Sequence, residues 1–338
     1  MLDKRQIENN ISWLVSHASS PVKYLTHKYL LKTDPSSKTM KDLWVKMKND
    51  RQVKSLFSKQ RSDGSWGNGP YKLKTLQEDY TPFTPKYVTT VWILPMLGDL
   101  GFDTNDERIR KACEYVMSYQ CPDGMFYRRK VKDSIPNVEG YREPTHPCDL
   151  SIYLTALGSI GLGKDKRLTE SYNQLLRMQR RDGGWVSEFH KQKLNWTRSC
   201  PWVSYFGASA LYYSRNPEYR SQLIKALNFL IWHLSIKEEK EIRRFFYHGH
   251  NMVKELLMFS EYEIDMSQKS IRVLFEWLLT MYHQEEGFFE YQGKPISRFA
   301  QRQDGVAARV MKYRLYHLIE TDWFTYYLSR IAMNILKH

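Results

Sequence analysis

Three short stretches of the chain combine cysteine and histidine, the residue types that hold zinc in many proteins. They are THPCDLS at 145–151, TRSCPWVS at 197–204 and FFYHGHNM at 245–252. Zn²⁺ prefers tetrahedral sulfur and nitrogen ligands and keeps one position open when it is catalytic. Bound zinc could hold a thiolate at neutral pH or polarise a carbonyl group. The candidate metal ligands are Cys148, Cys200, His248, His250 and His146.

The same stretches also carry a candidate acid and candidate anion ligands. Asp149 directly follows Cys148, and desolvation in an apolar pocket can keep a carboxyl group protonated. An arginine precedes each stretch or lies within it, and arginines that converge there would bind a phosphate or diphosphate. These arginines are Arg142, Arg198, Arg243 and Arg244.

Each stretch opens a helix that is apolar nearly all round, and an amphipathic, charged helix follows it. Helices that are apolar on every side are buried, so we call the first kind inner and the second kind outer. The predicted inner helices are 21–32, 85–101, 147–163, 200–214, 251–260 and 304–319. The predicted outer helices are 38–60, 105–120, 164–179, 217–234, 267–282 and 321–337, and an extra helix at 3–16 precedes them. Asn105 and Asp165 suit the N-caps of outer helices.

A loop phrase recurs between the outer and the inner helices. It is written QRSDGSW at 60–66, QCPDGMF at 120–126 and QRRDGGW at 179–185, with a worn copy, QEEGFF, at 284–289. A fixed period of this length indicates a repeat architecture. The glycine supplies a positive-φ turn, the glutamine can bond backbone groups at a helix end, and the aromatic ring packs between neighbouring pairs. We therefore predict structural roles for Trp66, Phe126, Trp185 and Phe288.

Six helix pairs of this kind predict an all-α fold, a closed α/α toroid with a central apolar cavity. An open solenoid would carry a polar stripe on its inner helices, and these helices are too apolar for that. We expect one domain over residues 1–338, with the extra helix in 1–18 and the helix-pair repeats in 20–338. Five aromatic residues of the inner helices would line the cavity: Trp92, Tyr153, Trp202, Tyr205 and Phe206.

The Q-x-x-D-G-x-W/F phrase, placed after an outer helix and before an inner one, resembles the QW repeat of squalene/hopene cyclases. It also resembles the related repeat of protein prenyltransferase β subunits. The resemblance covers about residues 50–290. It implies an α/α toroid with a deep apolar cavity, because this superfamily has that fold. Its members include terpene cyclases, prenyltransferases and relatives that are not enzymes.

The resemblance to protein farnesyltransferase bears on the zinc ligands. That enzyme opens an inner helix with a zinc-binding Asp-x-Cys, and here His146 and Cys148 occupy the two positions. Its zinc-binding histidine follows Phe-Tyr, as His248 follows Tyr247, which makes Tyr247 a candidate catalytic residue. The departure is an extra repeat, carrying Cys200, between them. Lanthipeptide cyclases, which are zinc toroids with Cys, Cys and His ligands, are an alternative that includes Cys200.

Two further implications come from the same superfamily. Class II terpene cyclases protonate their substrate with a D-x-D-D motif, which aligns here with HPCD at 146–149. Of that motif only Asp149 is present, at the last position, while Cys148 stands where the proton donor would be. Prenyltransferases place basic residues near the cavity rim for the prenyl diphosphate, a role that the four arginines would take.

Composition indicates which ligands the protein favours and in which cell compartment we expect it. The 338 residues carry a net charge of +14, which favours anionic ligands such as a diphosphate or nucleic acid. Four cysteines in a chain of this length do not indicate a disulfide framework. The charged N-terminus predicts no export signal, and no apolar run is long enough for a membrane span. We expect a cytoplasmic protein with reduced thiols.

Three functional interpretations remain open. The first is a prenyltransferase-like or terpene-cyclase-like enzyme that acts on an isoprenoid-like or peptide substrate in the cavity, with zinc at its mouth. The second is a toroid without catalytic activity that binds a hydrophobic ligand. The third is a basic helical-repeat protein that binds nucleic acid, with the segment 294–318 as the contact.

The zinc interpretation predicts one equivalent of metal in the purified protein. Because thiolates are strong zinc ligands, Cys148→Ala and Cys200→Ala should each lose the metal, which elemental analysis combined with native mass spectrometry would measure. Full zinc content in both variants would contradict these ligands and favour the second interpretation.

Overall fold

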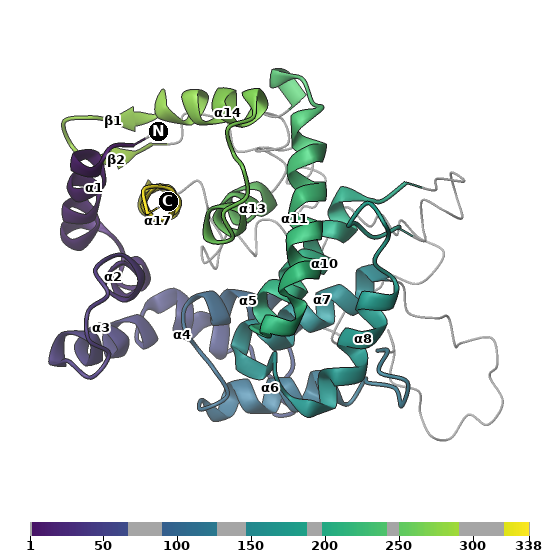
Figure 1. Ribbon diagram of the computed structural model, residues 1–338. Helices are drawn as coiled ribbons and strands as arrows, with labels where there is room; N and C mark the ends of the chain where they lie inside the picture. Colours follow the sequence, from purple (N-terminus) through teal and green to yellow (C-terminus); the bar gives the residue numbers. More distant parts are fainter. Residues whose placement is uncertain are drawn as a thin grey trace. The chain divides into compact units, whose positions relative to one another are not determined.

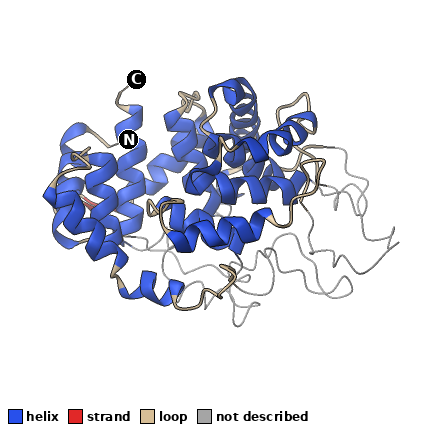
Figure 2. Cartoon of the chain, turned by 90° about the horizontal axis from the view of Figure 1, so that it is seen from below, coloured by secondary structure: helices blue, strands red, loops and turns tan. Residues whose placement is uncertain are grey.

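The computed structural model describes residues 2–66, 90–126, 147–187, 198–241, 250–290 and 321–337, without the side chains of 250–252. The described parts are mostly helical, as predicted (Figure 2). Among them, one short hairpin pairs β1 (Tyr282–His283) with β2 (Phe288–Phe289) in antiparallel register. None of the described helices has the length and apolar character needed to cross a membrane.

The chain divides into two compact units. Unit 1 comprises Met1–Ser58 with Ile231–His338, and unit 2 comprises Lys59–Leu230. We describe each unit by itself. A closed toroid formed by all 338 residues therefore stays a prediction, as does its central cavity.

Unit 2 contains three successive inner helices, α5, α7 and α10, with α7 packed against both of the others. Their side chains are almost all buried, whereas α6 and α8 bury one face each. This is the predicted alternation of inner and outer helices. The elements are α5 (Thr90–Asp99), α6 (Glu107–Met117), α7 (Pro147–Leu157) continuing as η3 (Gly158–Leu162), η4 (Lys166–Leu168), α8 (Thr169–Arg177), α10 (Pro201–Ser214), η5 (Pro217–Tyr219) and α11 (Arg220–Ser235), which runs on into unit 1.

Unit 1 is built around α17, which packs against α13 on one side and against α1 and α2 with η1 on the others (Figure 1). Its elements are α1 (Lys4–His17), α2 (Ser20–Leu25) continuing as η1 (Thr26–Leu30), α3 (Lys38–Lys48), α4 (Arg51–Phe57), α13 (His250–Glu261), α14 (Lys269–Leu279), the β1–β2 hairpin and α17 (Thr321–Ile335).

Short polar side chains start the outer helices. The Asp165 carboxylate accepts a hydrogen bond from the Arg167 backbone N–H at 2.9 Å, as expected of an N-cap. In the repeat before it, the N-cap of α6 is Asp106, one residue after the predicted Asn105. Both aspartates bind the arginine two residues further on, Arg108 and Arg167, so the aspartate serves as cap and ion-pair partner together.

The glutamine of each clear loop phrase joins its loop to the next outer helix. Gln60 Nε2 donates to the carbonyl of Gly64 in its own loop (2.9 Å) and to that of Arg108 in α6 (2.8 Å). Gln179 Nε2 repeats both bonds, to Gly183 and to Gln222 in α11, each at 2.9 Å. The prediction that glutamine bonds helix-end carbonyls is confirmed, and the helix is that of the following repeat.

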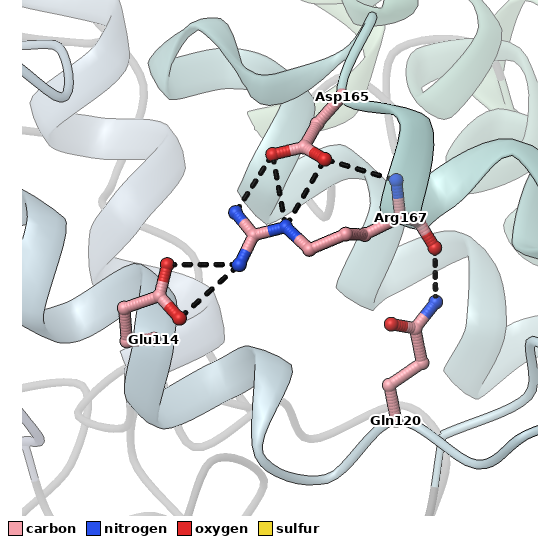
Figure 3. Close-up of polar contacts among 4 residues, drawn as sticks. All are labelled: Glu114, Gln120, Asp165 and Arg167. Atoms are coloured by element: carbon pink, nitrogen blue, oxygen red, sulfur yellow. Dashed lines mark hydrogen bonds and ion pairs between the residues drawn. The ribbon is translucent and has the colours of Figure 1, made fainter.

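The middle copy shows how the outer-helix start is tied together (Figure 3). Gln120 Nε2 donates to the Arg167 carbonyl at 2.7 Å, while the Arg167 guanidinium binds Asp165 and reaches back to Glu114 of α6 at 3.0 Å. These hydrogen bonds raise the pKa of Arg167 above its usual value, so the arginine is charged at any physiological pH. One side chain thus links two consecutive outer helices.

The loop glycines lie directly against the backbone of the next outer helix. Gly183 has φ +89°, and a Cβ there would lie 2.2 Å from the Lys225 carbonyl oxygen. Gly287 in the worn copy has φ +76°, and its Cβ would lie 2.9 Å from the Asn9 carbonyl carbon in α1. No L side chain fits either place, because both conformation and space exclude it.

In three of the four phrases, a hydroxyl group on the inner helix that follows binds the backbone of the loop aromatic. The backbone N–H donates from Trp66 to Thr90 Oγ1 (2.9 Å), from Trp185 to Ser204 Oγ (3.0 Å) and from Phe289 to Thr325 Oγ1 (2.9 Å). The rings of Trp66, Phe126 and Trp185 are almost fully buried, as predicted. In the worn copy Phe289 is buried in place of the predicted Phe288, because this loop is one residue shorter. Phe288 is half-buried, stacks on His283 and meets Trp13 at a tilt of 31°.

These contacts assign two helices, α17 and α1, to other places in the repeat than the sequence predicted. Thr325 gives α17 the hydroxyl that marks an inner helix, whereas the sequence places 321–337 as an outer helix. Gly287 packs on α1 as the other loop glycines pack on outer helices, so α1 is an outer helix and not an extra one. The buried Asn10 amide of α1 also lies 2.9 Å from the Ser329 hydroxyl of α17. The predicted inner helix at 304–319 lies outside the described residues.

Replacing Trp185 tests the packing of the loop aromatic between neighbouring helix pairs, a position that we call the seam. The ring is fully buried against Gly207, and its Nε1 donates to the Leu175 carbonyl at 2.8 Å. Trp185→Ala should therefore lower the free energy of unfolding by about 3–5 kcal/mol, measured by denaturant titration. The control is Trp232→Ala, at a ring that is 54% exposed, which should cost less than about 1 kcal/mol. Equal losses in the two variants would contradict a seam role.

Candidate functional site

The structure describes about half of the predicted site residues. Those in unit 2 are Trp92, Cys148, Asp149, Tyr153, Arg198, Cys200, Trp202, Tyr205 and Phe206. Arg142, His146, Arg243, Arg244, Tyr247, His248 and the side chain of His250 lie outside the described residues. The metal and anion predictions that depend on them therefore stay predictions.

Four of the five predicted cavity aromatics gather around one ring, that of Phe206. Trp92 of α5, Trp202 and Tyr205 all meet it edge-on, with ring centroids 5.5, 5.1 and 5.0 Å away. Trp92 and Phe206 are buried, while Trp202 and Tyr205 are half-buried. We call these four residues the aromatic cluster. It offers apolar ring surface from two inner helices, and edge-to-face packing holds the rings in place.

The fifth aromatic, Tyr153, lies elsewhere. It is fully buried and stacks on Phe126 with a centroid distance of 4.6 Å and an interplanar angle of 12°. Phe126 is the ring of the second loop phrase, so Tyr153 belongs to the seam between the helix layers. Tyr153 therefore packs against a loop aromatic, in place of the cavity position predicted for it.

The N-terminal ends of α7 and α10 carry the described cysteines and the acid. Cys148 is half-buried and Asp149 fully buried in the first turn of α7. Cys200 is the buried N-cap residue of α10. Burial raises the pKa of the Cys200 thiol, while the backbone N–H groups of Val203 and Trp202 act in the opposite direction. A thiolate at this position would therefore need a bound cation.

Metal and anion ligands are incomplete in the part of the chain that the structure describes. Within it, no group of three His, Cys, Asp or Glu side chains is arranged to hold a metal ion. Arg198 is exposed, two residues before the N-cap of α10. Cys148 and Cys200 thus remain two candidate ligands, and the imidazole rings of the candidate histidines His146, His248 and His250 lie outside what the structure describes.

Sequence reasoning missed a repeated pentapeptide. WVSYF at 202–206 in α10 and WFTYY at 323–327 in α17 share a Trp, a hydroxyl residue, a Tyr and a second aromatic. In both helices the tryptophan meets the second aromatic, Phe206 at 5.1 Å or Tyr327 at 6.0 Å. This pattern could have identified α17 as an inner helix, because it contains the hydroxyl residue that binds the loop aromatic and an aromatic residue two positions to either side of it.

Two charged residues on α13, Lys254 and Glu255, were also missed. Each is only 9% exposed. A left-handed residue follows both helices, Arg215 directly after α10 and Glu263 two residues after the end of α13. Counting back from it aligns Lys254 with Phe206 and Glu255 with Gly207. Lys254 Nζ accordingly lies 4.8 Å from the Tyr327 ring centroid of the next inner helix. Glu255 takes the position at which Gly207 meets a seam ring, so we do not assign it to a site.

Comparisons with known proteins give distant likenesses. No family model and no curated protein matches the chain. A variant of the type II terpene cyclase MstE from Scytonema, in complex with merosterolic acid A, matches with a TM-score of 0.44 and 15% identity over 85% of this chain and 78% of that one. The same enzyme in complex with geranylgeranyl dihydroxybenzoate gives 0.44 and 16%, over 85% and 76%. A protein from Actinoplanes gives 0.44 and 14%, over 98% of both chains.

These likenesses are too weak to show what the chain does. TM-scores below 0.5 and identities near 15% do not establish a shared activity.

The buried Glu255 makes stability depend on pH. Burial raises the pKa of its carboxyl group from 4.5 to about 8. Between these pH values the folded chain keeps a proton that the unfolded chain has released, so the free energy of unfolding falls as the pH rises. Glu255→Gln should match the wild type at pH 5 and exceed it at pH 8 by on the order of a few kcal/mol. Urea titrations at both pH values measure this, and parallel profiles would show that the carboxyl group is not buried.

Proposed function

We propose that this chain binds an isoprenoid-like hydrocarbon on the aromatic cluster and acts on it as a cyclase-like or prenyltransferase-like enzyme. The observation that carries the proposal is the gathering of Trp92, Trp202 and Tyr205 around Phe206. Two of the four rings are half-buried, so they keep surface that a ligand could cover.

The cluster has the physical properties that such a ligand requires. Burying an apolar group against aromatic rings contributes about 25 cal/mol for each Å² removed from water. Ring faces also attract positive charge, and the indole of tryptophan does so most strongly. A cationic carbon that develops along an isoprenoid chain would therefore be stabilised beside Trp92 and Trp202. An aliphatic lining would supply the first property without the second.

The reacting groups would come from the first turns of α7 and α10. Asp149 is the described acid, fully buried in the first turn of α7, and it would be the group that protonates an alkene of the substrate. Cys148 and Cys200 open neighbouring inner helices, so they could share one zinc ion with one of the predicted histidine ligands. Two sulfur donors suit zinc, and the bound ion would supply Lewis-acid chemistry or hold a substrate thiolate. Arg198 would bind a diphosphate group outside these helix starts.

Ligand titration tests the binding step. A C20 polyprenol should bind the wild-type protein, and Phe206→Ala should weaken binding about tenfold or more. Removing the central ring takes away apolar burial worth roughly 1.5–3 kcal/mol, and each 1.4 kcal/mol is about a tenfold change in affinity. Isothermal titration calorimetry measures both, with Trp232→Ala as the matched control. Equal affinity in all three proteins would place the ligand elsewhere.

Catalysis is tested separately from binding. Incubation with a C20 polyprenyl diphosphate, followed by mass spectrometry, distinguishes a cyclised isomer of unchanged mass from a product that has lost diphosphate. Asp149→Asn should abolish isomer formation while leaving the calorimetric affinity within a few-fold of wild type. Binding without any product in the wild-type protein would favour the alternative, a toroid that binds a hydrophobic ligand without catalysis.

A further inference from the structure

Trp202 carries a polar group for which the described residues offer no partner. Its Nε1 is buried, and no acceptor in the described part of the chain lies within hydrogen-bonding distance. The ring itself is half-buried and meets Phe206 edge-on, with 69° between the ring planes. The unsatisfied N–H therefore belongs to the aromatic cluster and not to the packed core.

A second tryptophan of the same unit shows the usual arrangement. Trp185 is also buried, and its Nε1 donates to the Leu175 carbonyl at 2.8 Å. Buried indole N–H groups normally find such an acceptor, since leaving a donor unsatisfied away from water costs free energy. Groups without one call for an explanation, and a ligand is one of the explanations.

The location of Trp202 indicates the kind of acceptor. It lies in the first turn of α10, whose fourteen residues begin at Pro201. The N-terminus of a helix carries partial positive charge, which favours anionic or strongly polar oxygen. The exposed Arg198 precedes the same helix start. Phe206 lies one turn further along α10 and offers only apolar surface, so the surroundings change from polar to apolar along the helix.

We propose that Trp202 Nε1 donates a hydrogen bond to an oxygen atom of the ligand. The ligand class is then an isoprenoid that carries a carboxylate, carbonyl, hydroxyl or phosphoester oxygen at one end. That end lies at the start of α10, and the hydrocarbon runs from Trp202 toward Phe206 and Trp92. This inference rests on the proposed function and adds to it a class of ligand, an orientation and a residue that sets specificity.

Three ligands of equal chain length test the inference: a C20 polyprenoic acid, a C20 polyprenol and a C20 polyene without oxygen. The wild-type protein should bind the acid and the alcohol roughly five- to tenfold more tightly than the polyene, the usual range for one hydrogen bond to a buried donor. Calorimetry measures the affinities. The indole ¹H–¹⁵N signal, assigned by its loss in Trp202→Phe, should shift downfield with the oxygenated ligands only.

The matched variant replaces Trp202 with benzothienylalanine, which keeps the shape of the ring and lacks the N–H. It should bind the polyene as the wild type does and lose the preference for the oxygenated ligands. Trp92→Phe, which alters another ring of the cluster, should weaken all three ligands and keep the preference.

Each contrary outcome has a separate meaning. Equal wild-type affinity for the three ligands, or a preference that survives benzothienylalanine, would overturn the role of Trp202 and leave the proposed function standing. If none of the three ligands binds, the proposed function itself fails.

Discussion

Much of the described structure depends on one close contact, the approach of a loop glycine to the backbone of the next outer helix. At Gly183 this approach leaves no room for even a methyl group, and the positive φ lets the chain reverse in the same residue. The glutamine of the loop can then reach two carbonyl groups at once, one in its own turn and one in the neighbouring helix. The amide thereby joins each loop to the first turn of the outer helix that follows it.

Because of this arrangement, an inner helix needs only one polar side chain near its start to bind the loop before it. A single hydroxyl group, such as Ser204, receives the backbone N–H of the loop aromatic, and the aromatic ring fills the space behind it. The inward positions that remain can then be chosen for a ligand. The aromatic cluster lies at these positions, with Phe206 two residues beyond Ser204 and Trp202 two residues before it. In the proposed function, stability and binding are thereby carried by different residues of the same helix.

The sequence predicted the helical class, the alternation of inner and outer helices and the buried loop aromatics, because all three are written in local patterns. It misplaced what depends on distant partners. Tyr153 and Phe206 are both aromatic residues on apolar helices, and only the position of Phe126 decides that Tyr153 belongs to the seam. The role of α17 depends on the contact between Phe289 and Thr325, which the period of the repeat does not reveal. Matching the two pentapeptides would have recovered that assignment.

The two pentapeptides also separate what is common to the inner helices from what varies. The hydroxyl group and the flanking aromatics recur in α10 and α17, so they follow from the repeat. What differs is the partner of the second aromatic: Phe206 meets the indole of Trp92, whereas Tyr327 meets the ammonium group of Lys254. An indole edge extends an apolar surface, and an ammonium group over a ring brings positive charge to it. The partner of the second aromatic therefore sets the character of that part of the inner helix, which is apolar beside Phe206 and cationic beside Tyr327.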